Sequence, residues 1–85
     1  MSSDPPDDGW LQERQRIGRS IKAARIHRNL TQEAVFLAIP MNRSYYQEIE
    51  AGAANPTLDT LLDISKAIGV QLAELLDERP PLNGG

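Results

Sequence analysis

The stretch that decides the fold runs from Leu30 to Gly52 and reads LTQEAVFLAIPMNRSYYQEIEAG. It predicts two short helices joined by a tight corner. Each helix would begin after a good capping residue, Thr31 or Asn42, whose side-chain oxygen can accept from the amides of the first turn. Pro40 is expected to end the first helix, because proline lacks an amide hydrogen and disfavours helical backbone at the preceding residue. Gly52 is expected to end the second helix, as glycine commonly does.

The second of these helices is predicted to have an apolar face and a polar face. Tyr46 and Ile49 lie three positions apart, which places both on the inward side of a helix. The opposite side carries Arg43, Ser44, Gln47 and Glu48. Such a helix suits the major groove of DNA, where an arginine can donate to two acceptor atoms of one guanine. A helical hairpin whose polar side is merely solvated gives the same pattern, so this stretch alone leaves both interpretations open.

The flanking sequence favours the first interpretation. The segments IGRSIKAARIHRNLTQ, MNRSYYQEIEAG and NPTLDTLLDISKAIGVQLAELL resemble the lambda-repressor-like, Xre-type helix-turn-helix family, without a gap from about Ile17 to Leu76. The resemblance implies an all-α fold, a compact five-helix DNA-binding domain over residues 9–78 with the helix-turn-helix at about 31–50. Its third helix would enter the major groove. NRSYYQEIEAG followed by ANPTL looks most like the controller proteins of restriction–modification systems, which are dimeric autoregulators.

Eight residues are the candidates for DNA contact: Gln32, Asn42, Arg43, Ser44, Tyr45, Gln47, Glu48 and Asn55. Arg43 is expected to bind O6 and N7 of a guanine, and the small Ser44 beside it lets the helix approach the bases. Tyr45 is expected to touch a thymine methyl group or, through its hydroxyl, a phosphate. Glu48 either accepts from a cytosine amino group or is a solvated side chain that repels wrong sites. Gln32 and the amides that follow it are expected to bind a phosphate, since helix N-termini favour anions.

A preceding helix, predicted from about Gly9 to Arg28, places Arg25 on its apolar side, within a turn of Ile21. A buried guanidinium needs a carboxylate partner, and the family's pattern puts that partner at Glu50. We therefore expect a structural ion pair between Arg25 and Glu50. The alternative is an arginine whose head group reaches solvent or a phosphate.

Three further residues lead to expectations about packing. Trp10 lies ahead of the family match and is expected to extend the core or to cover a neighbouring helix. Gly18 lowers helix propensity and suggests that another helix approaches closely. Leu37 belongs to an apolar outer face of the first short helix, which a partner or the N-terminal extension could cover, or which is a tolerated surface patch.

The charge distribution matters more than the net charge of −3. Residues 14–30 carry six basic side chains and no acid, whereas residues 31–56 carry one base against three acids. The remaining acids concentrate at the two ends of the chain. An acidic far side weakens non-specific DNA affinity, which is mostly phosphate neutralisation, so specific contacts must contribute more.

Composition excludes several other classes. The 85 residues suit one domain, with residues 1–8 predicted to be disordered and residues 79–85 a flexible tail. Without cysteine, and with His27 as the single histidine, neither a disulfide framework nor a metal site is expected. No nucleotide-binding or zinc-protease motif occurs. The expectation is therefore a non-enzyme without cofactor or small-molecule ligand. It would be a soluble bacterial cytoplasmic protein that joins the nucleoid when bound to DNA, with no membrane segment.

Double-stranded DNA and a second copy of the chain are the expected partners. The resemblance implies self-association through the fourth and fifth helices, where the exposed members of one set form the candidate interface: Val70, Leu72, Leu75 and Leu76. An antitoxin-type autorepressor fits equally well. A protein-interaction module that uses its acidic surface and Leu37 is the alternative from another class.

Overall fold

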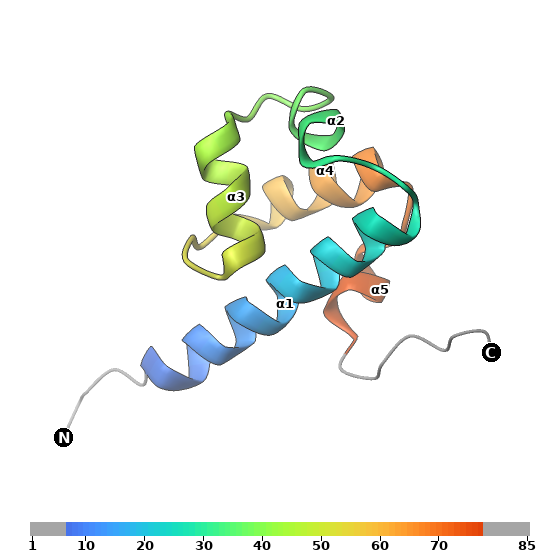
Figure 1. Ribbon diagram of the computed structural model, residues 1–85. Coiled ribbons are helices and arrows are strands. Elements are labelled where there is room, and N and C mark those ends of the chain that lie inside the picture. The colour runs from blue at the N-terminus through green and yellow to red at the C-terminus, as the bar shows by residue number, and fades with distance from the viewer. Residues whose placement is uncertain (1–6, 78–85) are drawn as a thin grey trace, which may run out of the picture.

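The computed structural model describes residues 7–77, and the N-terminal and C-terminal segments predicted to be flexible lie mostly outside this range. Within it the fold is all-α (Figure 1). The five helices are α1 (Asp7–His27), α2 (Gln32–Phe36), α3 (Arg43–Ala51), α4 (Leu58–Ile68) and α5 (Leu72–Leu76). The first helix begins at Asp7, two residues before its predicted start, so residues 7 and 8 are helical rather than disordered.

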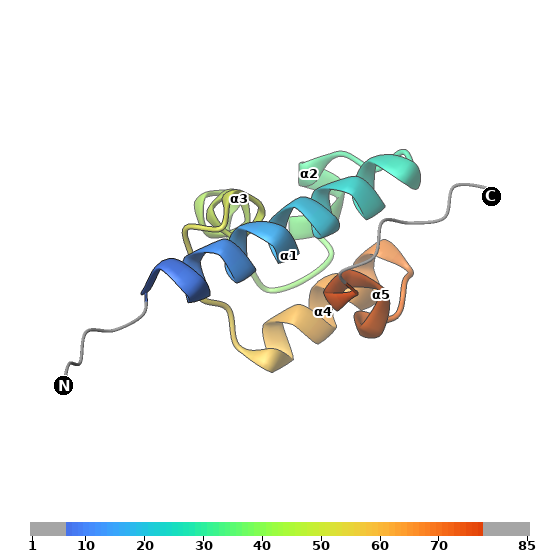
Figure 2. The same ribbon diagram turned by 90° about the horizontal axis from the view of Figure 1, so that it is seen from below.

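The long helix α1 runs across the molecule and packs against α3, α4 and α5. Figure 2 shows α4 and α5 on the side of α1 that faces away from α3. The core between these elements contains Ile21, Val35, Phe36, Tyr46, Ile49, Ala54, Ile64, Ile68 and Leu75. All five helices contribute to this core, so the position of α3 depends on the whole domain.

The ends of the helices follow the sequence signals. The Thr31 hydroxyl accepts from the Ala34 amide at 3.0 Å, and Oδ1 of Asn42 accepts from the Tyr45 amide at 2.8 Å. Gly52 ends α3 with φ of 79°, a left-handed conformation that glycine adopts without a steric penalty. The start and the end of α3 are therefore both fixed by local chemistry.

The corner between α2 and α3 differs from the prediction in one respect. Helix α2 ends at Phe36, four residues before Pro40, and residues 37–40 form turns. The Ala38 amide donates to the carbonyl of Val35, and the Met41 amide donates to that of Ile39. Because proline disfavours helical backbone at Ile39, the last turn tightens before it. Among residues 7–77 positive φ occurs only at Asn29, Gly52 and Gly69, so this corner needs no glycine.

Gly18 lets α3 lie directly on α1. A Cβ atom at this position would stand 2.4 Å from the carbonyl oxygen of Glu50 and 2.6 Å from that of Ile49. Both neighbours are backbone atoms, so they cannot turn aside as a side chain can. The expected close approach at Gly18 therefore sets the distance between α1 and the end of α3.

The packing expected of Trp10 is wrong, because 61% of its surface is exposed. The first turns of α1 project past the other helices (Figure 1), which agrees with this exposure. No helix within residues 7–77 has both the length and the apolar character needed to cross a membrane.

Candidate nucleic-acid interface

A buried ion pair joins α1 to the end of α3. Nε of Arg25 donates to Oε2 of Glu50 at 2.7 Å, and Nη2 donates to Oε1 at 3.2 Å. Each residue is only 8% exposed. Planar bidentate pairing of this kind fixes orientation as well as distance. Arg25 thereby holds the C-terminal turn of α3 in place.

The Glu50 carboxylate has two more donors. The Tyr46 hydroxyl donates to Oε2, and Nε2 of Gln32 donates to Oε1 at 3.0 Å. Burial alone would raise the pKa of Glu50, but the hydrogen bonds from Arg25, Tyr46 and Gln32 outweigh burial and hold that pKa below its usual value. Burial, together with the bond to Glu50, raises the pKa of the Tyr46 hydroxyl. Glu50 is therefore ionised and Tyr46 neutral near pH 7.

The same network fixes the amide of Gln32. Because an ionised carboxylate only accepts hydrogen bonds, Gln32 must turn its Nε2 toward Glu50. Its Oε1 then faces α3, where it accepts from Nε2 of Gln47 at 3.2 Å. Each amide nitrogen keeps one further N–H. The hydrogen bond between Gln47 and Gln32 therefore joins the middle of α3 to the start of α2, and one N–H of each side-chain amide remains for another acceptor.

Arg43 is held against α2. Its Nη2 lies 3.2 Å from Oε2 of Glu33, and its guanidinium carbon lies 5.1 Å from the centroid of the Phe36 ring. The side chains of Arg43 and Glu33 are both 58% exposed. An exposed ion pair contributes little to stability, so Arg43 can exchange Glu33 for another acceptor at small cost. Neither contact is predicted from the sequence, where the only related signal is the helical spacing of Val35, Phe36 and Ile39 that predicts a buried Phe36.

The polar face of α3 is open to solvent. Arg43, Ser44, Gln47 and Glu48 are exposed, and Tyr45 is half-buried against the core. Oδ1 of Asn42 accepts the capping bond from the Tyr45 amide, and the side-chain N–H groups of Asn42 remain available to another partner. Asn55 is exposed but lies at the other end of α3. The structure therefore joins Gln32 to Gln47 across α2 and α3, holds Arg43 against α2 at the start of α3, and sets Asn55 apart from these residues.

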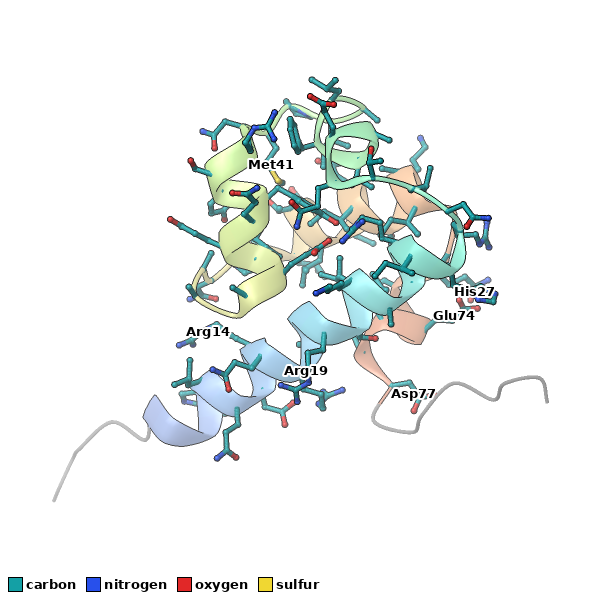
Figure 3. All side chains as sticks on the ribbon, in the orientation of Figure 1. Arg14, Arg19, His27, Met41, Glu74 and Asp77 are labelled. Carbon is teal, nitrogen blue, oxygen red and sulfur yellow. The ribbon has the colours of Figure 1, made fainter. Side chains whose placement is uncertain are left out.

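Asn55 belongs to a cleft at the C-terminal end of α3. The cleft is lined by Arg14, Ile17, Ile49, Ala54, Asn55, Pro56 and Leu61. Arg14 comes from α1 and lies on the side of that helix that faces α3, as Figure 3 shows. No pattern in the sequence separates Arg14 from the other basic residues between positions 14 and 30.

The four candidate dimer residues differ in how much of each is exposed to solvent. Leu75 is 1% exposed and belongs to the core, so it cannot contact a partner. Val70 and Leu72 are half-buried, and Leu76 is 37% exposed. Two leucines of α4, Leu58 and Leu62, are 61% and 45% exposed one helical turn apart. The apolar face of α4 is thus wider than the core requires.

Comparison with known proteins identifies the family. The helix-turn-helix family profile matches residues 21–75. Over 62 residues the chain is 37% identical to control protein C.BamHI of Bacillus amyloliquefaciens, a match covering 72% of this chain and 76% of that protein. Control protein C.MunI of a Mycoplasma species is 36% identical over 64 residues, which cover 74% of this chain and 86% of that protein.

The immunity repressor protein of Bacillus phage phi105 is 37% identical over 62 residues, but the match spans 43% of its length and 73% of this chain. No solved structure matches the chain. The capped α2–α3 pair, the solvent-facing polar side of α3 and the extent of these matches agree with one another: the chain belongs to the helix-turn-helix family.

Proposed function

We propose that this protein is a sequence-specific transcription regulator that binds a palindromic DNA operator as a homodimer and controls its own expression. The observation that carries the proposal is the polar face of α3, which is solvent-exposed while Tyr46 and Ile49 anchor the opposite face in the core. The relatives named as control proteins and as a repressor support it. In a bacterial cell such a protein would reside in the cytoplasm, on the nucleoid when bound.

Base reading is assigned to the exposed residues of α3. Arg43 uses one hydrogen bond for Glu33 and keeps other N–H groups for O6 and N7 of a guanine. Ser44, next to it, is small enough for close approach. Glu48 is exposed and can only accept, so a cytosine amino group is the base atom that suits it. Tyr45 contributes its ring edge at the flank of this face.

Phosphate binding is assigned to the start of α2. Gln32 and Gln47 each keep an amide N–H after their mutual hydrogen bond, and both can donate to one phosphate oxygen. The first amides of α2 add to the attraction, since helix N-termini favour anions. These contacts are independent of base sequence, so they would set the position of α3 in the groove rather than its preference.

Dimerisation is assigned to the exposed parts of α5 and the residues just before it, with Leu76 as the central side chain and Val70 and Leu72 beside it. Helix-turn-helix dimers place their recognition helices about 34 Å apart, which is one turn of DNA. Because Leu75 is buried in the core, the remaining apolar surface is small. We therefore expect a weak dimer in solution that DNA strengthens.

Selection of binding sites from a random pool of DNA duplexes tests the proposal. We expect an inverted repeat whose half-sites are one helical turn apart. A pool that yields no enriched sequence would contradict sequence-specific binding.

A second candidate rests on Leu37, whose side chain is 74% exposed on the outer side of the α2–α3 corner. An apolar residue at such a site fits a protein partner. A salt series separates the two functions, because operator binding weakens with salt in proportion to the phosphates contacted, whereas an apolar protein contact does not.

A further inference from the structure

The DNA-facing elements of this protein are short of positive charge. From Gln32 to Pro56, which covers α2, α3 and the following loop, Arg43 is the single base, against Glu33, Glu48 and Glu50. Neutralisation of phosphates supplies most of the sequence-independent affinity of a DNA-binding protein. A cation from outside these elements would therefore add affinity at the edge of the site.

Two of the four arginines of α1, and the arginine that directly follows this helix, already have partners inside the protein. Arg25 pairs with Glu50, and Arg28 donates to the carbonyl of Gly69 at 2.8 Å. Arg16 donates to the carbonyl of Leu76 at 3.0 Å and to the Glu13 carboxylate at 2.7 Å. These three side chains connect α1 to the ends of α3, α4 and α5, so their function in the fold is clear.

Arg14 is different. Nε of Arg14 and Nε of Arg16 are both shielded from solvent with no hydrogen-bond partner in the described range, but Arg16 is held through its Nη1 and Nη2 atoms. No such bond from a terminal nitrogen of Arg14 is found within the part of the chain that the structure describes. Its side chain lines the cleft at the end of α3 together with Asn55 and Pro56. Among residues 7–77, no carboxylate lines that cleft.

The position of Arg14 on α1 points it toward the DNA-facing side. It precedes Arg25 by eleven residues, about three helical turns, so the two arginines lie on the same face of α1. That face carries the end of α3, since a Cβ atom on Gly52 would stand 2.6 Å from Cα of Gln15. In Figure 3, Arg14 lies on the edge of α1 that faces α3 and Arg19 lies on the opposite edge.

We propose that Arg14 binds a backbone phosphate of DNA beside the loop that follows α3. Its aliphatic stem packs along Ile17 in the apolar cleft, and its guanidinium donates to the phosphate next to the Asn55 amide. The long α1 would thus extend the interface beyond the helix-turn-helix, to a phosphate outside the bases that α3 reads. This inference rests on the proposed function, because it requires that α3 lies in the major groove.

The experiment compares Arg14→Met, which removes the charge and keeps an apolar stem, with the matched control Arg19→Met on the opposite edge of α1. Affinity for the duplex selected from the random pool is measured over a series of KCl concentrations. One lost phosphate contact lowers the slope of log affinity against log salt by about 0.9 per chain. We expect this fall for Arg14→Met, a slope like that of the wild type for Arg19→Met, and recovery in Arg14→Lys.

A second measurement uses the wild-type protein and therefore does not depend on the folding of a variant. Single phosphates flanking each half-site are replaced by neutral methylphosphonates. We expect one flanking position at which the replacement weakens the wild-type protein but leaves Arg14→Met unchanged. Equal loss of slope in the two methionine variants, or the absence of any sensitive flanking phosphate, would overturn the inference. Failure of the wild type to select any DNA sequence would instead overturn the proposed function.

Discussion

At the scale of single residues, Glu50 is the centre of the structure that supports α3. Its carboxylate accepts from Arg25, Tyr46 and Gln32, which belong to three different helices. Replacing Arg25 or Glu50 by alanine leaves the remaining charge buried and unpaired. We expect a loss of roughly 3–5 kcal/mol in the free energy of unfolding, the usual cost of breaking a buried pair. Urea denaturation at pH 7 measures it, and an unchanged midpoint for both variants would contradict the prediction.

The lowered pKa of Glu50 gives a second prediction. A carboxyl group whose pKa is lower in the folded state stabilises the fold above its unfolded pKa, about 4.3 for glutamate, and loses that contribution as the pH falls through its folded pKa. We expect the stability difference between the wild type and Glu50→Gln to be largest near neutral pH and to shrink in acid below about pH 4. A difference that stays constant between pH 7 and pH 3 would show that the charge of Glu50 is not responsible.

Arg43 gives the residue-scale prediction for binding. Arg43→Ala removes the only side chain on α3 that can donate to two guanine atoms at once. We expect a loss of about 1–3 kcal/mol on the selected operator and weaker discrimination at one base pair of each half-site. Titrations with operators substituted at single base pairs locate that position. An equal loss on selected and scrambled DNA would mean that Arg43 holds the backbone and reads no base.

At the scale of whole elements, local chemistry explains what could be predicted from the sequence. The caps at Thr31 and Asn42 and the stop at Gly52 depend on neighbouring residues only, and all three are found as predicted. Pro40 lies outside the helix as predicted, but α2 already ends at Phe36. That earlier end depends on how the last turn tightens, which the sequence does not show. Trp10 could not be placed, because exposure depends on where the other helices end relative to α1.

The contacts of the candidate interface also differ in how far the sequence could predict them. The pairing of Arg25 with Glu50 follows from a family pattern, whereas the contact of Arg43 with Glu33 and Phe36 depends on the angle at the α2–α3 corner. Arg14 could not be identified from the sequence, because its neighbours in the cleft, apart from Ile17, are 35 to 47 residues away along the chain. Residues that are far apart in sequence but meet in the fold produce no periodic pattern in the sequence.

The packing of α3 on α1 leads to an element-scale prediction. Alanine favours helix over glycine by about 1 kcal/mol, so Gly18→Ala would stabilise an isolated α1. In the folded protein its Cβ would meet the carbonyl oxygens of Ile49 and Glu50. Overpacking of this kind typically costs about 1–3 kcal/mol, so we expect net destabilisation in urea denaturation. Ser20→Ala in the same helix serves as the control, and a stabilised Gly18→Ala would show that α3 moves away freely.

At the scale of the whole molecule, one chain would present to DNA only the short helix α3 and little positive charge, so two chains on one operator would multiply otherwise weak contacts. The apolar surfaces available for self-association are Leu76 at the end of α5 and the pair Leu58 and Leu62 on α4. The family resemblance implied self-association through the fourth and fifth helices, but the sequence could not separate the buried Leu75 from the exposed Leu76. Both surfaces are small for a stable dimer, for which about 800 Å² per partner is usual.

The last prediction therefore concerns assembly on DNA. We expect sedimentation at saturation to show two chains per operator, and Leu76→Glu to abolish cooperative binding while leaving affinity for an isolated half-site unchanged. The charge would be desolvated at the dimer contact but remains in water on a single chain. Leu62→Glu is the matched variant on α4. Loss of cooperativity in Leu62→Glu alone would move the interface from α5 to α4, and one chain per saturated operator would exclude the homodimer altogether.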